Sequence, residues 1–139
     1  MDTKILKGTL LGTVVFFLLG WLVYGILLAD FMATNYNTCN NRPNGEMEWW
    51  AIIVSNLAMA LLLTLFLKWS NSKVFSDGLK IGALYGFLLG TGIDLSFYSM
   101  TTMFNSLSIL IVDVLVNTVL MAIIGMVIVL LWGKEKQPE

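Results

Sequence analysis

Four long apolar segments dominate the chain and constrain its fold more than any other feature. They cover about residues 9–28, 50–67, 79–100 and 108–132. Each is close to the roughly 20 residues that an α-helix needs to cross about 30 Å of hydrocarbon. Backbone polar groups have no water to bind in lipid, so segments of this kind satisfy them as helices. The sequence predicts an all-α integral membrane four-helix bundle that forms one domain, residues 1–139.

The composition supports a membrane location. The chain is 58% hydrophobic and 12% charged, and its mean hydropathy is +0.82. A soluble domain is nearer half apolar and a quarter charged, and a chain of 139 residues has too little interior to bury the excess. We therefore expect the lipid bilayer as the main partner. Because the net charge is −1 and no basic patch is present, we expect no binding to nucleic acid.

Two residue types limit the chemistry that the chain can perform. It contains no histidine, which excludes His-ligated zinc or haem and His-based catalysis. Its single cysteine, Cys39, excludes an intramolecular disulfide and a CxxC redox pair. We therefore expect the protein not to be an enzyme, with no catalytic residue, no cofactor and no metal centre.

The basic residues predict the orientation. Seven of the eight flank the apolar segments on one side: Lys4, Lys7, Lys68, Lys73, Lys80, Lys134 and Lys136. Only Arg42 lies in the predicted outer loop, about residues 30–48, which is rich in asparagine and predicted to be solvated turn. The positive-inside rule predicts that both termini are cytoplasmic, in the inner (plasma) membrane of a bacterium. The first apolar segment is longer than a signal-peptide core, so we expect a retained helix.

Glycines at helical spacing predict where the helices approach one another. The third segment carries four of them at every fourth position, and the first segment begins with a shorter pair: Gly78, Gly82, Gly86 and Gly90, then Gly8 and Gly12. Residues four apart share a helix face. Small residues on one face let membrane helices pack closely where no hydrophobic effect drives them together.

Polar residues in the apolar segments form the candidate site. Counted from the outer segment ends, four of them lie at a similar depth of roughly 6–9 Å, with a fifth one turn deeper: Tyr24, Asn56, Asp94, Asp113 and Asn117. Neither aspartate has a basic partner within the membrane. The acids could be protonated, bind a cation or amine, or reach outer water. Two interpretations stay open: a layer that binds protons or cations, and a hydrogen-bonded clasp that fixes helix register.

Short motifs add a family resemblance. The segment from Gly20 to Gly25, which contains Trp21 and Tyr24, and the acid-containing last segment with Asp113 resemble small bacterial four-helix membrane proteins grouped as domain of unknown function 1761. The resemblance implies a four-span membrane protein and assigns no activity.

The sequence predicts two classes of function. The first is a non-enzymatic accessory or structural bundle that packs through glycine-rich helix faces. Its expected partner is a second copy of the chain or another membrane protein. The alternative is a small carrier or ion-binding protein that uses Asp94 and Asp113. A carrier would need a homodimer, because four helices rarely enclose a conduit.

Overall fold

The computed structural model describes residues 2–39, 41–43 and 45–133. In chain order its elements are α1 (Thr3–Leu22), the π-helical turn η1 (Val23–Leu27), α2 (Ala29–Asn35), α3 (Trp49–Trp69), α4 (Phe75–Met100) and α5 (Leu107–Gly133). The predicted all-α class is confirmed. Within these residues, the one strand-like pairing is an isolated antiparallel bridge between Tyr36 and Phe104.

Four helical segments are long and apolar enough to cross a membrane. They are Thr3–Leu27, Trp49–Trp69, Phe75–Met100 and Leu107–Trp132, one for each predicted apolar run. The first and third begin several residues before the predicted boundaries, because polar side chains cap their first turns. The Asp77 carboxylate, for example, accepts hydrogen bonds from the backbone N–H groups of Lys73 and Val74 at the start of α4. These polar turns lengthen each helix beyond its apolar stretch.

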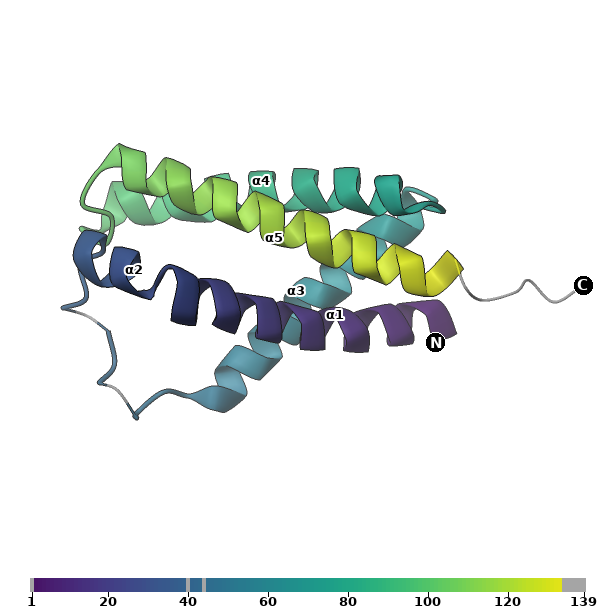
Figure 1. Ribbon diagram of the computed structural model, residues 1–139, viewed down its shortest axis with the longest axis horizontal. Coiled ribbons are helices and arrows are strands. Elements are labelled where there is room, and N and C mark those ends of the chain that lie inside the picture. Colours follow the sequence, from purple (N-terminus) through teal and green to yellow (C-terminus); the bar gives the residue numbers. More distant parts are fainter. Residues whose placement is uncertain (1, 40, 44, 134–139) are drawn as a thin grey trace, which may run out of the picture.

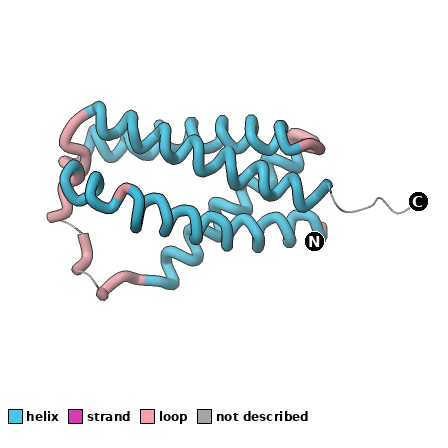
Figure 2. The backbone as a smooth tube through the Cα atoms, in the orientation of Figure 1, coloured by secondary structure: helices cyan, strands magenta, loops and turns pink. Residues whose placement is uncertain are grey.

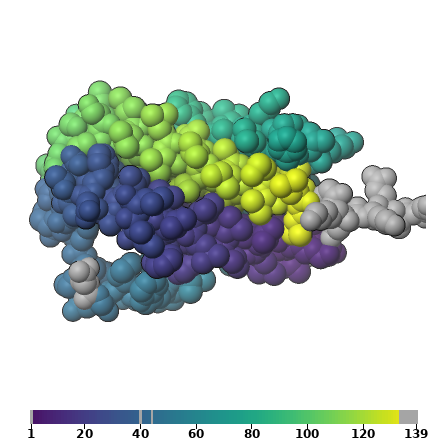
Figure 3. Space-filling view, viewed as in Figure 1, coloured from purple at the N-terminus to yellow at the C-terminus, as the bar shows by residue number. Residues whose placement is uncertain are grey.

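The helices form two unequal pairings. Helices α4 and α5 run antiparallel along most of their lengths, α1 lies along α5, and α3 crosses obliquely behind α1 (Figure 1). On the face shown in Figure 3, α1 and α5 lie in continuous contact. Helix α3 is more deeply buried toward its end: Ala60, Leu63 and Leu67 are fully buried, whereas Trp49 and Trp50 near its start are exposed. The start of α3 therefore stands apart from the bundle.

One end of the bundle carries lysines from several segments. We call it the lysine end; there α1 and α4 begin, and α3 and α5 end. The lysines near it are Lys4, Lys7, Lys68, Lys73 and Lys80, whereas Lys134 and Lys136 lie outside the described residues. The main apolar core lies toward this end and joins α3, α4 and α5. Its members are Leu63, Leu67, Tyr85, Met121, Ile124, Ile128, Val129 and Trp132.

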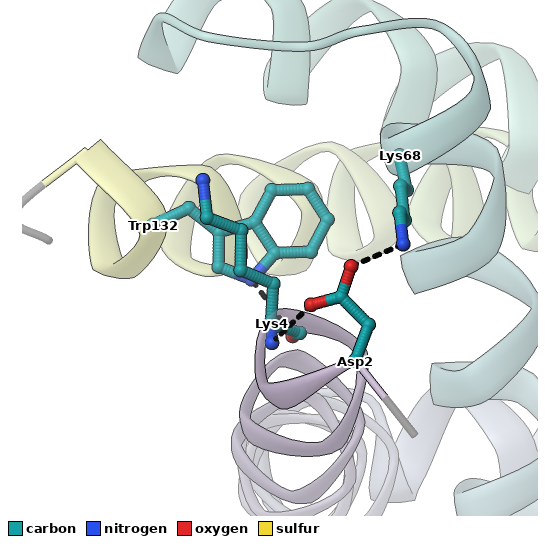
Figure 4. Close-up of polar contacts among 4 residues, drawn as sticks. All are labelled: Asp2, Lys4, Lys68 and Trp132. Atoms are coloured by element: carbon teal, nitrogen blue, oxygen red, sulfur yellow. Dashed lines mark hydrogen bonds and ion pairs between the residues drawn. The ribbon is translucent and has the colours of Figure 1, made fainter. Parts of the chain in front are cut away.

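Polar contacts close the lysine end (Figure 4). Asp2 accepts the backbone N–H of Lys4 at 2.9 Å and forms an ion pair with Lys68 at the end of α3. The indole N–H of Trp132, on α5, donates to the carbonyl oxygen of Lys4 at 3.0 Å. The hydrogen bonds from Lys68 and Lys4 lower the pKa of the Asp2 carboxyl below its usual value. The start of α1 is thus tied to both α3 and α5.

The opposite end differs from the prediction of a solvated loop over about residues 30–48. Helix α2 continues the course of α1 after the wide turn η1 (Figure 2), and residues 29–37, which we call the strap, fold over the connection between α4 and α5. The physical reason is a second apolar cluster. Phe31, Tyr36 and Met103 pack against buried residues of that connection and of α5: Phe104, Ile109, Leu110 and Val114. The backbone N–H of Asn37 also donates to the carbonyl of Met103 at 2.9 Å.

Candidate functional site

The contact between α4 and α5 positions both aspartates. A Cβ atom added at Gly78 or Gly82 would collide with the backbone of α5, at Gly125 and Met121 respectively. At Gly86 it would lie 2.7 Å from the Met121 Cβ atom, and at Gly90 2.9 Å from the Asn117 Nδ2 atom. Asp94 is one helical turn beyond Gly90, so it lies on the same face of α4. The glycines thus let α5 approach α4 closely, and Asp94 lies on the face of α4 that packs against α5.

Asp113 is the polar centre of the strap end. It lies on α5 and is partly buried. The hydroxyl of Tyr24, from the π-helical turn η1, donates a hydrogen bond to its Oδ1 atom at 2.9 Å. A π turn holds one more residue than an α turn, which changes the direction of the side chains that follow, and such turns are frequent at functional sites. The structure therefore brings two of the predicted layer residues into direct contact.

Asp94 lies beside Asp113 and is more deeply buried. Only 7% of its surface is exposed, and its Oδ2 atom has no hydrogen-bond partner among the described residues. The Asp113 carboxyl is close enough to interact with it. Within the described part of the chain, the ion pairs Lys68–Asp2 and Arg42–Glu48 involve neither aspartate. Asp94 and Asp113 thus lie next to each other, and neither forms an ion pair with a described basic side chain.

Tyr36 joins this site although the sequence analysis missed it. Its ring packs on Phe104 with 5.1 Å between ring centroids, and its hydroxyl is buried without a hydrogen-bond partner in the structure. Burial and the nearby Asp113 carboxyl raise the pKa of the Tyr36 phenol, so it remains protonated and able to donate. A tyrosine among asparagines and threonines gives no periodic signal of burial, which is why the sequence did not indicate it.

The two predicted asparagines lie elsewhere. Asn117, one turn deeper on α5, donates to the carbonyl oxygen of Gly86 at 3.4 Å and so belongs to the α4–α5 contact. Asn56, on α3, lines a groove between α1 and α3 together with Thr13, Phe17 and Trp49. No hydrogen bond described for this chain links Asn56 to Asp94 or Asp113. The site consists of Tyr24, Tyr36, Asp94 and Asp113, which we call the acid–tyrosine cluster.

The acid–tyrosine cluster offers only oxygen atoms to a ligand. Two carboxyl groups and two phenols can hold a proton between the acids or surround a small cation, and they provide neither a thiol nor an imidazole. The cluster lies beneath the strap and the apolar contact of Tyr36 with Phe104. The burial of Asp94 strengthens the electrostatic interactions that its carboxyl group makes.

Comparison with known proteins gives one result. A family described as "Protein of unknown function (DUF1761)" matches residues 8–129, which is most of the chain and overlaps all four membrane-spanning candidates. No curated protein and no solved structure matched. The family expected from the sequence motifs is confirmed, and the chain belongs to the DUF1761 family of proteins of unknown function.

Proposed function

We propose that this chain is a non-enzymatic accessory protein of a bacterial inner membrane, with both termini in the cytoplasm and a bundle held together through glycine-rich helix faces. The close approach of α4 and α5 at Gly78, Gly82 and Gly86 carries this proposal, because a side chain at these positions would meet the backbone or side chains of α5. In lipid, van der Waals packing of this kind replaces the hydrophobic effect as the main attraction between helices. No arrangement of His or paired Cys is available for catalysis.

The lysine end supports the proposed orientation. Lysines from the starts of α1 and α4 and from the end of α3 gather there, whereas the strap end carries none of the described lysines. Short loops rich in lysine remain on the cytoplasmic side during insertion. The strap end then faces the opposite compartment.

The single cysteine provides a direct test of this orientation. Cys39 is exposed at the strap end. If this end faces away from the cytoplasm, a membrane-impermeant maleimide should label Cys39 in intact right-side-out inner-membrane vesicles. The matched control is a Cys39→Ser, Ser70→Cys variant, whose thiol would lie in the link between α3 and α4. It should be labelled only after the vesicles are permeabilised. The reverse pattern would refute the orientation.

A second function is supported by one specific observation. The Tyr24 hydroxyl donates to Asp113 while Asp94 has a buried oxygen without a partner, which is an arrangement suited to binding a proton or a cation. We propose this ion-binding role as the alternative function, with a homodimer required if ions are also transported. A thermal-shift screen of the detergent-purified protein across pH, alkali cations and lipophilic amines tests it. Asp94→Asn and Asp113→Asn should abolish the shifts, and identical shifts in all three proteins would refute it.

A further inference from the structure

Two buried oxygen atoms in the acid–tyrosine cluster have no hydrogen-bond partner. They are Oδ2 of Asp94 and the hydroxyl oxygen of Tyr36. Both side chains interact with Asp113. Buried polar atoms in proteins are almost always satisfied, so an Asp94 oxygen without a partner beside a second carboxyl group calls for a hydrogen-bond donor.

A proton fits this site better than a metal ion. Two neighbouring carboxylates in a sheltered place repel each other, and one shared proton removes that repulsion and supplies the missing donor. Divalent cations take about six or more oxygen ligands. Among residues 2–39, 41–43 and 45–133, no third carboxylate or thiol gathers with this pair. The charge and the number of ligands therefore favour the proton.

The surroundings of the two acids differ and indicate which one carries the proton. Asp113 accepts a hydrogen bond from Tyr24, and a hydrogen bond of this kind stabilises the ionised form of a carboxyl group. Asp94 is nine-tenths buried and lacks a partner at Oδ2, so its charged form has less compensation. The neutral acid is thus expected at Asp94 and the carboxylate at Asp113.

The strap covers this pair. Tyr36 packs against Phe104, and the strap is fixed to the α4–α5 connection by two hydrogen bonds of Asn37: its N–H to the Met103 carbonyl, and its Nδ2 to the Thr102 hydroxyl at 3.2 Å. The contact between Asn37 and Thr102 is exposed, where opening costs little. A proton that moves between Asp94 and the water at the strap end would pass beside this segment.

We propose that Asp94 is a proton-binding group, that Asp113 is the ionised carboxylate that accepts its hydrogen bond, and that the strap controls exchange of the proton with water. The proposal deepens the ion-binding function above and rests on it. On release, the proton passes from the Asp94 carboxyl to water and leaves two carboxylates; on uptake, it returns to Asp94. The titratable groups that act on one another here are Tyr24 from η1, Tyr36 from the strap, Asp94 from α4 and Asp113 from α5.

Infrared spectroscopy of the full chain in lipid nanodiscs tests the assignment of the proton. The C=O stretching band of a protonated carboxylic acid should be present at neutral pH and should disappear on alkalinisation. Asp94→Asn should lack the band. Asp30→Asn, which alters an exposed acid of the strap, is the matched control and should retain it. A band that survives in Asp94→Asn and disappears in Asp113→Asn would overturn the assignment, and so would the absence of any titrating band at Asp94.

The same experiment separates this proposal from the function on which it rests. If sodium stabilises the protein relative to choline at equal ionic strength and no carboxylic-acid band titrates, the pair binds a metal cation and no proton; the ion-binding function would then stand and the proton proposal would fail. If neither pH nor any ion affects the protein or its two aspartate variants, both fail.

A pH-jump measurement tests the strap. Asn37→Ala removes the hydrogen bond to Thr102 and the one that Asn37 accepts from the backbone N–H of Cys39, both at exposed positions. Only the first joins the strap to the α4–α5 connection, so the response of the Asp94 band should become about fivefold faster, as expected for the loss of one modest hydrogen bond. Asn105→Ala, in the adjacent loop and with no side-chain bond described to the strap, is the control. Equal rates in the parent and Asn37→Ala would refute control by the strap.

Discussion

The two ends of the bundle are built from different interactions. Toward the lysine end, α3, α4 and α5 bury a continuous apolar core, and glycines bring backbones into contact. Toward the strap end, α3 stands apart, α1 changes into a π turn, and two carboxyl groups lie next to each other. We infer that the first region supplies the stability that holds the second in an arrangement that would not persist alone. This division of roles is common where a site is strained or unsatisfied.

The largest expected effect comes from breaking the glycine contact between α4 and α5. Gly82→Leu would force a side chain against the backbone of α5 at Met121, and we expect a loss of about 3 kcal/mol or failure to fold. Gly92→Leu, on the same helix but with no atom within 4 Å of the added Cβ, is the matched control and should be neutral. Thermal midpoints in mild detergent measure both, and equal losses at the two sites would contradict the role assigned to this face.

The second prediction compares substitutions at two glycines of α1, Gly8 and Gly20. Gly8→Val would place a branched side chain 2.9 Å from the Thr64 Cγ2 atom and near Trp132, and it should destabilise the bundle by about 2 kcal/mol. Gly20→Val makes the same change in helix propensity at a position with open space around it. A thermal midpoint lowered only by Gly8→Val would sharpen the contrast between the two ends of α1. A larger loss at Gly20 would contradict it.

The hydrogen bond that closes the lysine end should have a smaller effect. Trp132→Phe keeps an aromatic ring but removes the donor to the Lys4 carbonyl, so we expect a loss of about 1 kcal/mol. Trp69→Phe changes an exposed ring on α3, which packs against Phe66, and serves as the control. Chemical denaturation of the two variants in the same detergent should separate them, with Trp69→Phe close to the parent.

The smallest expected effect concerns Asp2 and its dependence on pH. Because the pKa of Asp2 is lowered in the folded chain, its stabilising contribution is present above the unfolded pKa of about 3.9 and is lost as the pH falls through the lowered folded value. Asp2→Asn should therefore lower the thermal midpoint slightly at neutral pH and reduce the loss seen on acidification. Asp30→Asn at the strap end is the control. An unchanged acid dependence in Asp2→Asn would refute the contribution of this contact.

The sequence predicted the membrane-spanning helices well because each depends on local composition. The apolar runs near Leu63 and Ile124 are long enough to be recognised without tertiary information. The register of Asp94 followed from Gly90 four residues earlier, since residues on one helix share a fixed geometry.

The sequence could not predict in the same way where a residue lies around the bundle at a given depth. Counting residues gives the depth of Asn56 but not the angle at which α3 crosses the bundle, so a residue at the right depth lies in another groove. Tyr36 and the π turn around Tyr24 depend on contacts with α5 that are far away in the sequence. Tertiary packing decides such features, and local propensity does not reveal them.

The hydrogen bond from Trp132 to the carbonyl of Lys4 joins the two extremes of the described chain, and this has a consequence for biogenesis. The first span enters the bilayer long before the residues that complete its surroundings are synthesised. Gly8 and Gly12 meet Ile128 only when the last helix arrives, so the early spans must wait in lipid without their final neighbours. The last turn of α5 completes the packing of the bundle. A chain truncated within α5 should therefore be treated by cellular quality control as incompletely folded.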